Sequence, residues 1–413
     1  MLAYTTSFFA RSNYTGIAKF VSADLGLDKA SLGVMGAVFF YSYALAQMPW
    51  GVASDKWGNR KAVGTGILVM AATLWGFSTS SDYTELKVWR VLNGVAAAAV
   101  YVGMAGALSR WFSPKERGFS QSVFAGVGGA AGELAANVFL PVIVVYAGSS
   151  WRGSTVLMAA IIGAVGVACL VFLKSAPPGQ SAVERRPFEW HMLKDVRLWC
   201  FTAIYSGFII ALRILPPWLP IFAADIYISQ GMSLNEAVVA GGLLSTVYLG
   251  GRVLGVPAAG FVSDRLIGRV SRKTMATVFL FLNVGLLQLL SMGVTSTWVL
   301  ASIACLMGMT INLYPLITTA VSETFGPAKT SSVMGFINTW AQLCGATALA
   351  SSGFIGIALN TGAGNSLEEY RGIWLVGMAG CLLTAGLGVI LSYVVWRAGV
   401  RTPVVLADTS PRR

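Results

Sequence analysis

The sequence predicts an all-α polytopic membrane protein with twelve transmembrane helices in two pseudo-symmetric six-helix bundles. First, 55% of the 413 residues are apolar and only 11% are charged, which is too few charges to cover a water-soluble domain of this size. Second, apolar runs of about 20 residues, the length that crosses a bilayer as a helix, recur along the chain. Third, one short polar stretch occurs once in each half of the chain.

Polar connectors separate twelve apolar runs, and the longest connector divides six runs from six. We therefore expect an N-terminal bundle over 1–173, a linker over 174–197, a C-terminal bundle over 198–396 and a tail over 397–413. The predicted helices are 2–22, 31–52, 63–81, 87–110, 118–146, 153–173, 198–223, 236–262, 274–294, 297–323, 330–358 and 372–396.

Lysine and arginine are distributed unequally between alternate connectors. The set that includes the linker and the tail holds 20 of these residues, and the opposite set holds 4. Because basic loops stay in the cytoplasm, we expect both termini to be cytoplasmic and the protein to lie in the cell (inner) membrane. The same asymmetry accounts for the net charge of +12, so no nucleic acid partner is implied.

The repeated stretch is Gly-x-x-Ser-Asp followed by a basic residue. It begins at Gly51 and again 209 residues later at Gly260, each time at the end of an apolar run. A carboxylate at the C-terminal end of a helix opposes the helix dipole and needs a cationic partner or a facing helix N-terminus. We predict a conformational latch at the cytoplasmic membrane edge, separate from the binding site. Its members are Asp55, Arg60, Asp264 and Arg265.

Arginines lie deep within four predicted helices, at Arg11, Arg90, Arg213 and Arg252, whereas Glu133 is the only acid at comparable depth. Burying an arginine costs about 2.5–3.5 kcal/mol on insertion scales, so such a residue faces a wet cavity or a partner anion. Arg11 and Arg213 occupy matching places in the two halves, near the bilayer midplane. Transporters built from two repeats bind substrate there, so we predict that these two arginines bind an anionic group.

The other buried charges have two interpretations each. Glu133 is a candidate proton carrier, because a lone carboxyl group in a low-dielectric setting tends to hold its proton; alternatively it forms a permanent salt bridge to an arginine. Arg90 either lines the cavity and gates it or forms a structural pair, and Arg252 either gates or anchors its helix. Polar and aromatic candidates for substrate contacts are Tyr14, Tyr43, Gln47, Trp218, Tyr248, Asn338 and Gln342.

The repeated stretch resembles the signature loop of the major facilitator superfamily, which joins that family's second helix to its third and its eighth to its ninth. Arg90-Val-Leu-Asn-Gly94 resembles the family's motif in the fourth helix. The string from Arg11 to Tyr14, the run 110–118 and Arg213 are similar to the organophosphate:phosphate antiporters and the anion:cation symporters. The resemblance implies the major facilitator fold and an ion-coupled secondary transporter of a small organic anion, a carboxylate or a phosphorylated metabolite.

The sequence also departs from those two branches. The phosphate-ester exchangers carry a basic residue where this chain has Gln47 and a histidine where it has Gly128. The proton symporters commonly carry acids where this chain has Ala10 and Ala97. The predicted anion site is therefore present, whereas the residues that these two branches use for coupling are absent. Glu133 is left as the candidate for coupling transport to an ion.

Other classes of function fit less well. A proton-driven exporter of lipophilic compounds is expected to have an acidic or neutral cavity, and a transporter-like anion sensor would bind without flux. No enzyme, metal or cofactor is expected, because the single histidine, His191, lies in the linker and the five cysteines fall singly in apolar runs. The expected partners are a small anion, a coupling ion (a proton or a counter-anion) and the lipid bilayer, with the protein a monomer.

Overall fold

The computed structural model describes residues 1–111, 124–174, 190–265, 270–311, 314–360 and 367–397, apart from the side chains of a few residues within these ranges. The regular secondary structure of the described ranges is helical. The elements are α1 (Leu2–Leu25), α2 (Lys29–Trp57), α3 (Asn59–Thr79), α4 (Tyr83–Trp111), the π-helical turn η1 (Phe124–Gly128), α6 (Gly129–Tyr146), α7 (Trp151–Phe172), the 3₁₀ turn η2 (Trp190–Lys194), α8 (Val196–Ser229), α9 (Leu234–Arg265), α10 (Arg272–Ser291), α11 (Thr297–Ile311), α12 (Tyr314–Phe325), α13 (Pro327–Ala358) and α14 (Glu368–Arg397).

The described helices match the twelve predicted runs. The run 118–146 corresponds to η1 and α6, with 118–123 outside the described residues, and the run 297–323 corresponds to α11 and α12. Ten helical spans of the described chain are long and apolar enough to cross a membrane. They do not include α1 or α4. The apolar run of α1 is interrupted by Arg11, Asn13 and Lys19.

The predicted helix ends at 52 and 63 are wrong, because the signature stretch between them is helical. Helix α2 continues to Trp57 and α3 begins at Asn59, so the turn between them is Gly58 alone. Gly58 has φ 84° and ψ 149°, a conformation that residues with a side chain rarely adopt. The second copy of the stretch likewise lies inside α9, which ends at Arg265.

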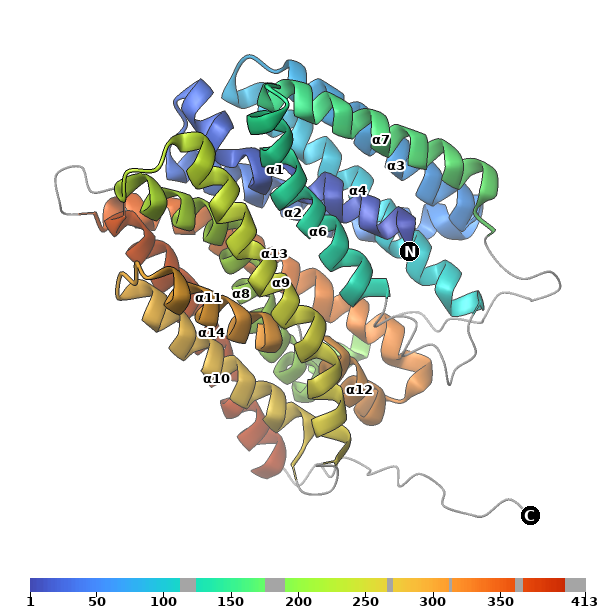
Figure 1. Ribbon diagram of the computed structural model, residues 1–413. Helices are drawn as coiled ribbons and strands as arrows, with labels where there is room; N and C mark the ends of the chain where they lie inside the picture. Colours follow the sequence, from blue (N-terminus) through green and yellow to red (C-terminus); the bar gives the residue numbers. More distant parts are fainter. Residues whose placement is uncertain (112–123, 175–189, 266–269, 312–313, 361–366, 398–413) are drawn as a thin grey trace.

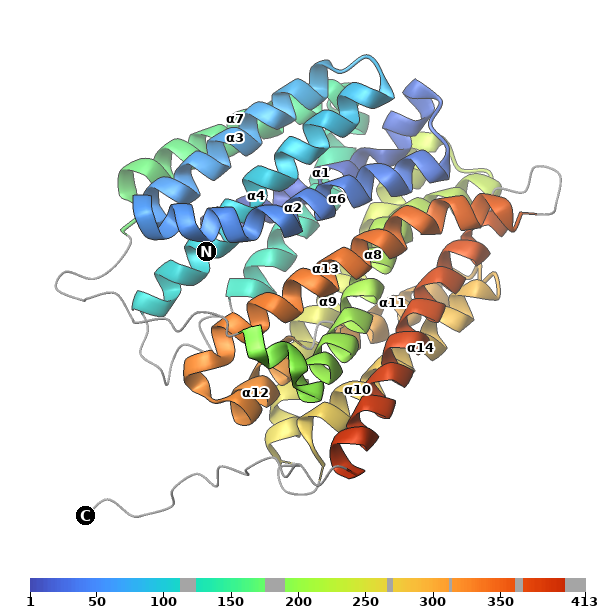
Figure 2. The same ribbon diagram turned by 180° about the vertical axis from the view of Figure 1, so that it is seen from behind.

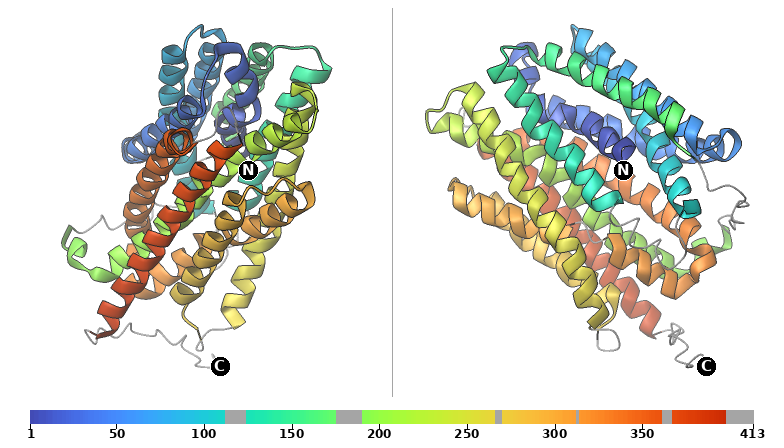
Figure 3. Two further views of the ribbon diagram at one scale, coloured as in Figure 1. Left: turned by 90° about the vertical axis from the view of Figure 1, so that its left-hand side faces the viewer. Right: turned by 45° about the vertical axis from the view of Figure 1, so that its right-hand side comes forward.

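The helices pack in two groups. Helices α1, α2, α3, α4, α6 and α7 pack against one another, and α8 to α14 form the second group (Figures 1 and 3). The groups meet where α6 runs beside α9, visible in Figure 1, and where α2 runs beside α13, visible in Figure 2. This arrangement confirms the predicted pair of six-helix bundles. The bounds of the linker stay a prediction, since 175–189 lie outside the described residues.

Glycines bring the two groups into backbone contact. A Cβ atom added at Gly353 of α13 would lie 2.2 Å from the carbonyl oxygen of Lys29 in α2. One added at Gly242 of α9 would lie 2.1 Å from the carbonyl oxygen of Asn137 in α6. Real Cβ atoms do not approach oxygen so closely, so only glycine allows these helices to pack at this distance.

Charged side chains join the two groups at the end where α1 and α8 finish and α2 and α14 begin, which we call the distal end. Lys19 pairs with Asp225, and Lys29 Nζ lies 2.7 Å from Glu369 Oε2. The Tyr370 hydroxyl donates to Asp225 Oδ2 at 2.6 Å. Both lysines belong to the first group and both acids to the second. This distal ion cluster of five residues therefore closes that end, which the predicted topology places outside the cell.

Replacing Asp225 with asparagine is expected to shift the protein toward a state open at the distal end, because Lys19 loses its ionic partner across the two groups. A cysteine at Ile221, which is buried beside Lys19 in a small cavity, would report this opening. In a variant whose native cysteines are serines, we expect a membrane-impermeant maleimide to label that cysteine several-fold faster. The control is Asp24→Asn, because Asp24 pairs with Arg152 inside one group. Equal labelling rates in the parent and in Asp225→Asn would contradict the expected role.

Candidate functional site

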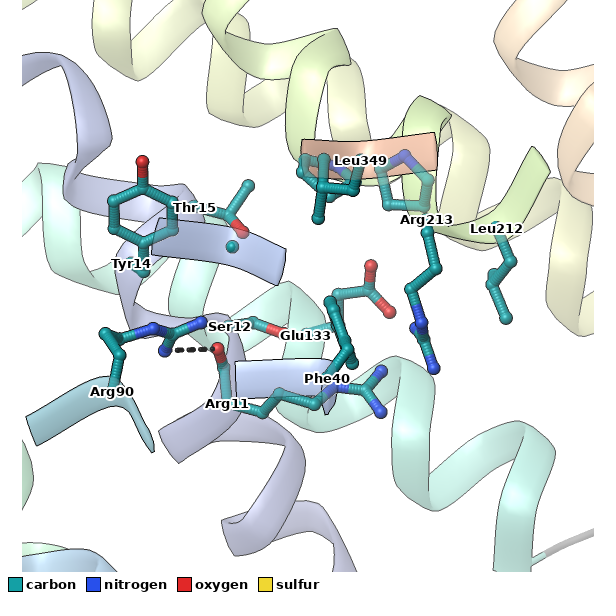
Figure 4. A pocket seen from close by; sticks show the side chains of 13 residues that line it. Arg11, Ser12, Tyr14, Thr15, Phe40, Arg90, Glu133, Leu212, Arg213 and Leu349 are labelled. Carbon is teal, nitrogen blue, oxygen red and sulfur yellow. Dashed lines mark hydrogen bonds between the residues drawn. The ribbon is translucent and has the colours of Figure 1, made fainter. Parts of the chain in front are cut away.

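A cavity of about 30 Å³ lies between the two groups and is lined by residues of α1, α2, α4, α6, α8 and α13. This volume is on the scale of one or a few water molecules, so the cavity is narrow in this conformation. Its charged lining residues are Arg11, Arg90, Glu133 and Arg213 (Figure 4). Three cations and one acid therefore meet at the interface of the two groups.

Arg11 rests on aromatic rings. Its guanidinium carbon Cζ lies 3.7 Å from the ring centroid of Phe8 and 5.6 Å from that of Phe40. Among the described residues it forms no ion pair and donates no side-chain hydrogen bond. Phe8 precedes Arg11 by about one helical turn, so the two side chains lie on the same face of α1.

Arg213 is buried, with 4% of its surface exposed. Its Nε and Nη2 donate to Gln342 Oε1 at 3.2 Å and 2.7 Å, and its Cζ lies 3.8 Å from the ring centroid of Phe40. Pro216 and Pro217 follow in α8 and line the cavity. Proline lacks an N–H, so these two residues leave the preceding helical carbonyls without their usual donors beside the site.

Phe40 of α2 brings the two predicted ligands together, because the guanidinium groups of both Arg11 and Arg213 lie over its ring. Figure 4 shows the two side chains directed toward one another from opposite groups. The face of an aromatic ring attracts cations and offsets part of their mutual repulsion. No carboxylate of the described residues forms an ion pair with either arginine, so the site keeps an excess of positive charge.

Glu133 is paired with Arg252. The distance from Arg252 Nη1 to Glu133 Oε2 is 3.1 Å, and the two side chains are 4% and 8% exposed. Gly129, one turn before Glu133 in α6, makes room for the pair, because an added Cβ would lie 3.0 Å from Arg252 Nη2. This geometry matches the salt-bridge interpretation of Glu133 and joins α6 to α9. A role in coupling stays a prediction.

Arg90 is held by neutral acceptors. It donates to the carbonyl oxygen of Met35 and to Asn13 Oδ1, both at 3.4 Å. It also donates to the carbonyl oxygen of Arg11 at 3.3 Å (Figure 4). These bonds tie α4 to the backbone of α1 beside the Arg11 side chain. Arg90 therefore lines the cavity and also fixes the helix that carries Arg11.

The predicted aromatic residues are spread around the site. Tyr14 lines the cavity and donates to a backbone carbonyl of α2. Tyr43 stacks on a neighbouring phenyl ring, and the Trp218 indole donates to Ser352 Oγ at 3.0 Å; neither lines the cavity. The Tyr248 hydroxyl is buried, has no hydrogen-bond partner among the described residues and does not line the cavity.

The three predicted amides form a hydrogen-bonded chain that starts at Arg213. Gln342 Nε2 donates to Asn338 Oδ1 at 3.3 Å, and Asn338 Nδ2 donates to Gln47 Oε1 at 3.2 Å. We call these three residues the amide chain. It crosses from α13 in the second group to α2 in the first.

The predicted latch is only partly described. The side chains of Asp55 and Asp264 lie outside the described part of the structure. Arg60 and Arg265 are exposed at the helix ends, and Arg265 Cζ lies 4.1 Å from the ring centroid of Phe261. A role in the conformational cycle stays a prediction.

Phe8 and Phe40 were not predicted as site residues. Phenylalanine is common in the apolar runs of this chain, so its presence alone carries no signal. The spacing of Phe8 and Arg11 in one helix is a usable signal for a stacked pair. The contact of Phe40 with Arg213 depends on how α2 and α8 pack, which spacing along the chain does not indicate.

Comparison with known proteins gives a family and several relatives. The family model of the Major Facilitator Superfamily matches residues 1–349. A probable sulfoacetate transporter of Cupriavidus necator is 24% identical over 302 residues, which cover 67% of this chain and 66% of the relative, just under two thirds of its length. The hexuronate transporter of Bacillus subtilis is 23% identical over 374 residues, which cover 86% of each chain. A solved bacterial homologue of the human lysosomal transporter Spinster, in an inward-facing and occupied conformation, has a TM-score of 0.73 at 17% identity over 96% of both chains.

Proposed function

The chain belongs to the major facilitator superfamily, and from this premise we propose that it is a secondary active transporter that moves a small organic anion across the membrane by alternating access. The family, together with ten spans of the described chain that are long and apolar enough to cross a membrane, makes it a multi-pass membrane protein. Two of its relatives are described as transporters of sulfoacetate and of hexuronate, which are both organic anions. The proposed substrate is a carboxylate or a phosphorylated metabolite.

The observation that carries this proposal is the convergence of Arg11 and Arg213 in one cavity between the two groups of helices. They come from opposite groups of helices, and neither has an ion pair among the described residues. Buried guanidinium groups require anionic or strongly polar partners. A substrate anion supplies the missing negative charge, and the planar guanidinium fork suits a carboxylate or phosphate.

Such an arrangement couples substrate binding to a conformational change. An anion held by both arginines draws the two groups together more strongly in a closed state than in an open one. Only a difference in affinity between states lets a ligand shift the conformational equilibrium. In the outward-open state of this cycle the distal ion cluster separates, and in the state described here it is closed.

The coupling ion is proposed to be a proton or a counter-anion. Glu133 is the carboxylate that lines the cavity, and its pairing with Arg252 keeps it close to the substrate arginines. We further propose a monomer in the cell (inner) membrane with both termini in the cytoplasm, on the basis of the charge asymmetry of the connectors.

Thermal unfolding and flux measurements on the purified protein test the proposal. We expect sulfoacetate or galacturonate at saturating concentration to raise the unfolding temperature, because a ligand that binds only the folded state stabilises it. The neutral sugar galactose is the matched control and is expected to have no effect. In proteoliposomes we expect counterflow uptake of the stabilising anion. Binding without flux would identify a sensor, and stabilisation by lipophilic cations instead of anions would favour an exporter.

A further inference from the structure

Gln342 determines how Arg213 is presented to the cavity. Both side chains are buried, at 5% and 4% exposure, and two N–H groups of Arg213, on Nε and Nη2, donate to the single oxygen Oε1 of Gln342. A guanidinium group has five N–H donors in a fixed plane and no acceptor. One edge of Arg213 is therefore occupied, and the edge formed by Nη1 and the second N–H of Nη2 is left for a ligand.

The orientation of every amide in the chain follows from this contact. Because a guanidinium only donates, Gln342 must turn its oxygen to Arg213 and its nitrogen to Asn338. Asn338 then accepts through Oδ1 and donates through Nδ2 to Gln47, as observed at 3.3 Å and 3.2 Å. The Tyr205 hydroxyl adds a second donor to Asn338 Oδ1 at 3.4 Å. Gln342 is thus held on both sides, by Arg213 and by Asn338, and has one stable orientation.

Arg11 and Arg213 consequently differ in how many of their N–H groups are available to a ligand. Arg11 rests on Phe8 and donates no side-chain hydrogen bond to a described residue, so its whole fork is available. Arg213 offers only the edge that Gln342 leaves. The acceptor on Arg213 is also neutral, which orients the guanidinium group without cancelling the positive charge that attracts the anion.

We propose that Gln342 is a positioning residue of the anion site: it occupies one edge of Arg213 and directs the opposite edge toward Arg11 and the bound anion. The inference rests on the proposed function, because it assigns Gln342 a role in anion binding without contact to the anion. The proposal also assigns a role to the amide chain. The chain links the orientation of Arg213 to the contact between α2 and α13, and so to the relative position of the two groups.

A double-mutant cycle between Gln342 and Arg213 tests the proposal, with sulfoacetate and galacturonate as probes. Methionine at position 342 keeps the length of the side chain and removes the acceptor. We expect Gln342→Met to weaken binding about tenfold or more in the wild-type background, the usual scale for a hydrogen bond to a charged group. In the Arg213→Ala background we expect no further loss, because Gln342 then has nothing to position.

Equal losses in both backgrounds would overturn the proposal and would mean that Gln342 contacts the anion or acts on folding alone. If neither probe binds the wild-type protein, the proposed function fails and this inference fails with it. If a probe binds the wild-type protein but the effects of the two substitutions on affinity are additive, the inference about Gln342 fails and the proposed function stands. The matched control is Asn283→Leu, which removes a buried amide bonded to Phe279 and Thr310 and is expected to leave the affinity unchanged.

Gln342→Glu gives a second, independent test with the same side-chain shape. A carboxylate at this position keeps the acceptor but supplies an internal anion to Arg213. We expect the unfolding temperature of the empty protein to rise and the affinity for both probes to fall by roughly tenfold to a hundredfold. A purely structural role for Gln342 predicts unchanged affinity, since the acceptor for Arg213 is preserved and only the donor to Asn338 is lost. Retained affinity in Gln342→Glu would therefore overturn the proposal.

Discussion

Replacing either Arg11 or Arg213 with alanine is expected to weaken binding of the substrate anion by about 30-fold to several thousandfold. This range corresponds to roughly 2–5 kcal/mol, the usual cost of removing one partner of a buried charge pair. Arg→Lys is also expected to be damaging, because lysine lacks the planar fork. Titration of a stabilising anion against the single variants measures the loss.

The double variant Arg11→Ala with Arg213→Ala tests whether both arginines bind the same anionic group of the substrate. If they do, the losses of the single variants are not additive, because either substitution already breaks the shared contact. Without ligand the two like charges repel, so each alanine variant is expected to raise the unfolding temperature of the empty protein. Arg152→Ala is the control, since Arg152 pairs with Asp24 inside one group and lies outside the cavity. Wild-type affinity in either single variant would remove that arginine from the site.

Replacing Glu133 with glutamine is expected to destabilise the folded protein by about 3–5 kcal/mol, because the buried charge of Arg252 loses the carboxylate at 3.1 Å. The double variant Glu133→Gln with Arg252→Gln removes both charges and is expected to recover much of this loss. Equilibrium unfolding in detergent measures both effects. A Glu133→Gln variant as stable as the wild type would show that the pair contributes nothing to stability.

The single variant Glu133→Gln also tests whether transport is coupled to protons. If Glu133 carries the coupling proton, Glu133→Gln retains counterflow exchange and loses accumulation driven by a pH gradient. Counterflow is the internal control, because it reports an intact binding site and an intact conformational cycle. Accumulation against a pH gradient in this variant would show that the proton travels by another route or does not travel.

The helices could be predicted from the sequence because a segment in the bilayer has to satisfy its backbone hydrogen bonds internally, as a helix, and therefore shows up as a run of apolar residues. Their ends could not, because hydropathy marks the part of a helix in the membrane and not the part that continues beyond it. Helix α2 carries on through Ser54 and Lys56 and stops where Gly58 adopts a positive φ. Helix α8 continues past residue 223 to Ser229, so Asp225 is buried inside the helix where the sequence indicated a polar boundary.

The meeting of Arg11 and Arg213 could be predicted because the two halves repeat and depth can be counted along a helix. Their surroundings could not be predicted in the same way. The pairs Lys19–Asp225 and Lys29–Glu369 join residues 206 and 340 positions apart. Such pairs depend on which faces two bundles turn toward each other, and the spacing of residues in one chain does not contain that information.

The glycine contacts between the two groups have a consequence for how this chain can diverge. At Gly353 and Gly242 one backbone meets another, and at those two points the closest contact involves no side chain of the cavity. Substitutions of the side chains that line the cavity therefore leave these two backbone contacts between the groups in place. A change of cavity side chains can therefore alter which anion binds while the backbones keep their spacing at these two points.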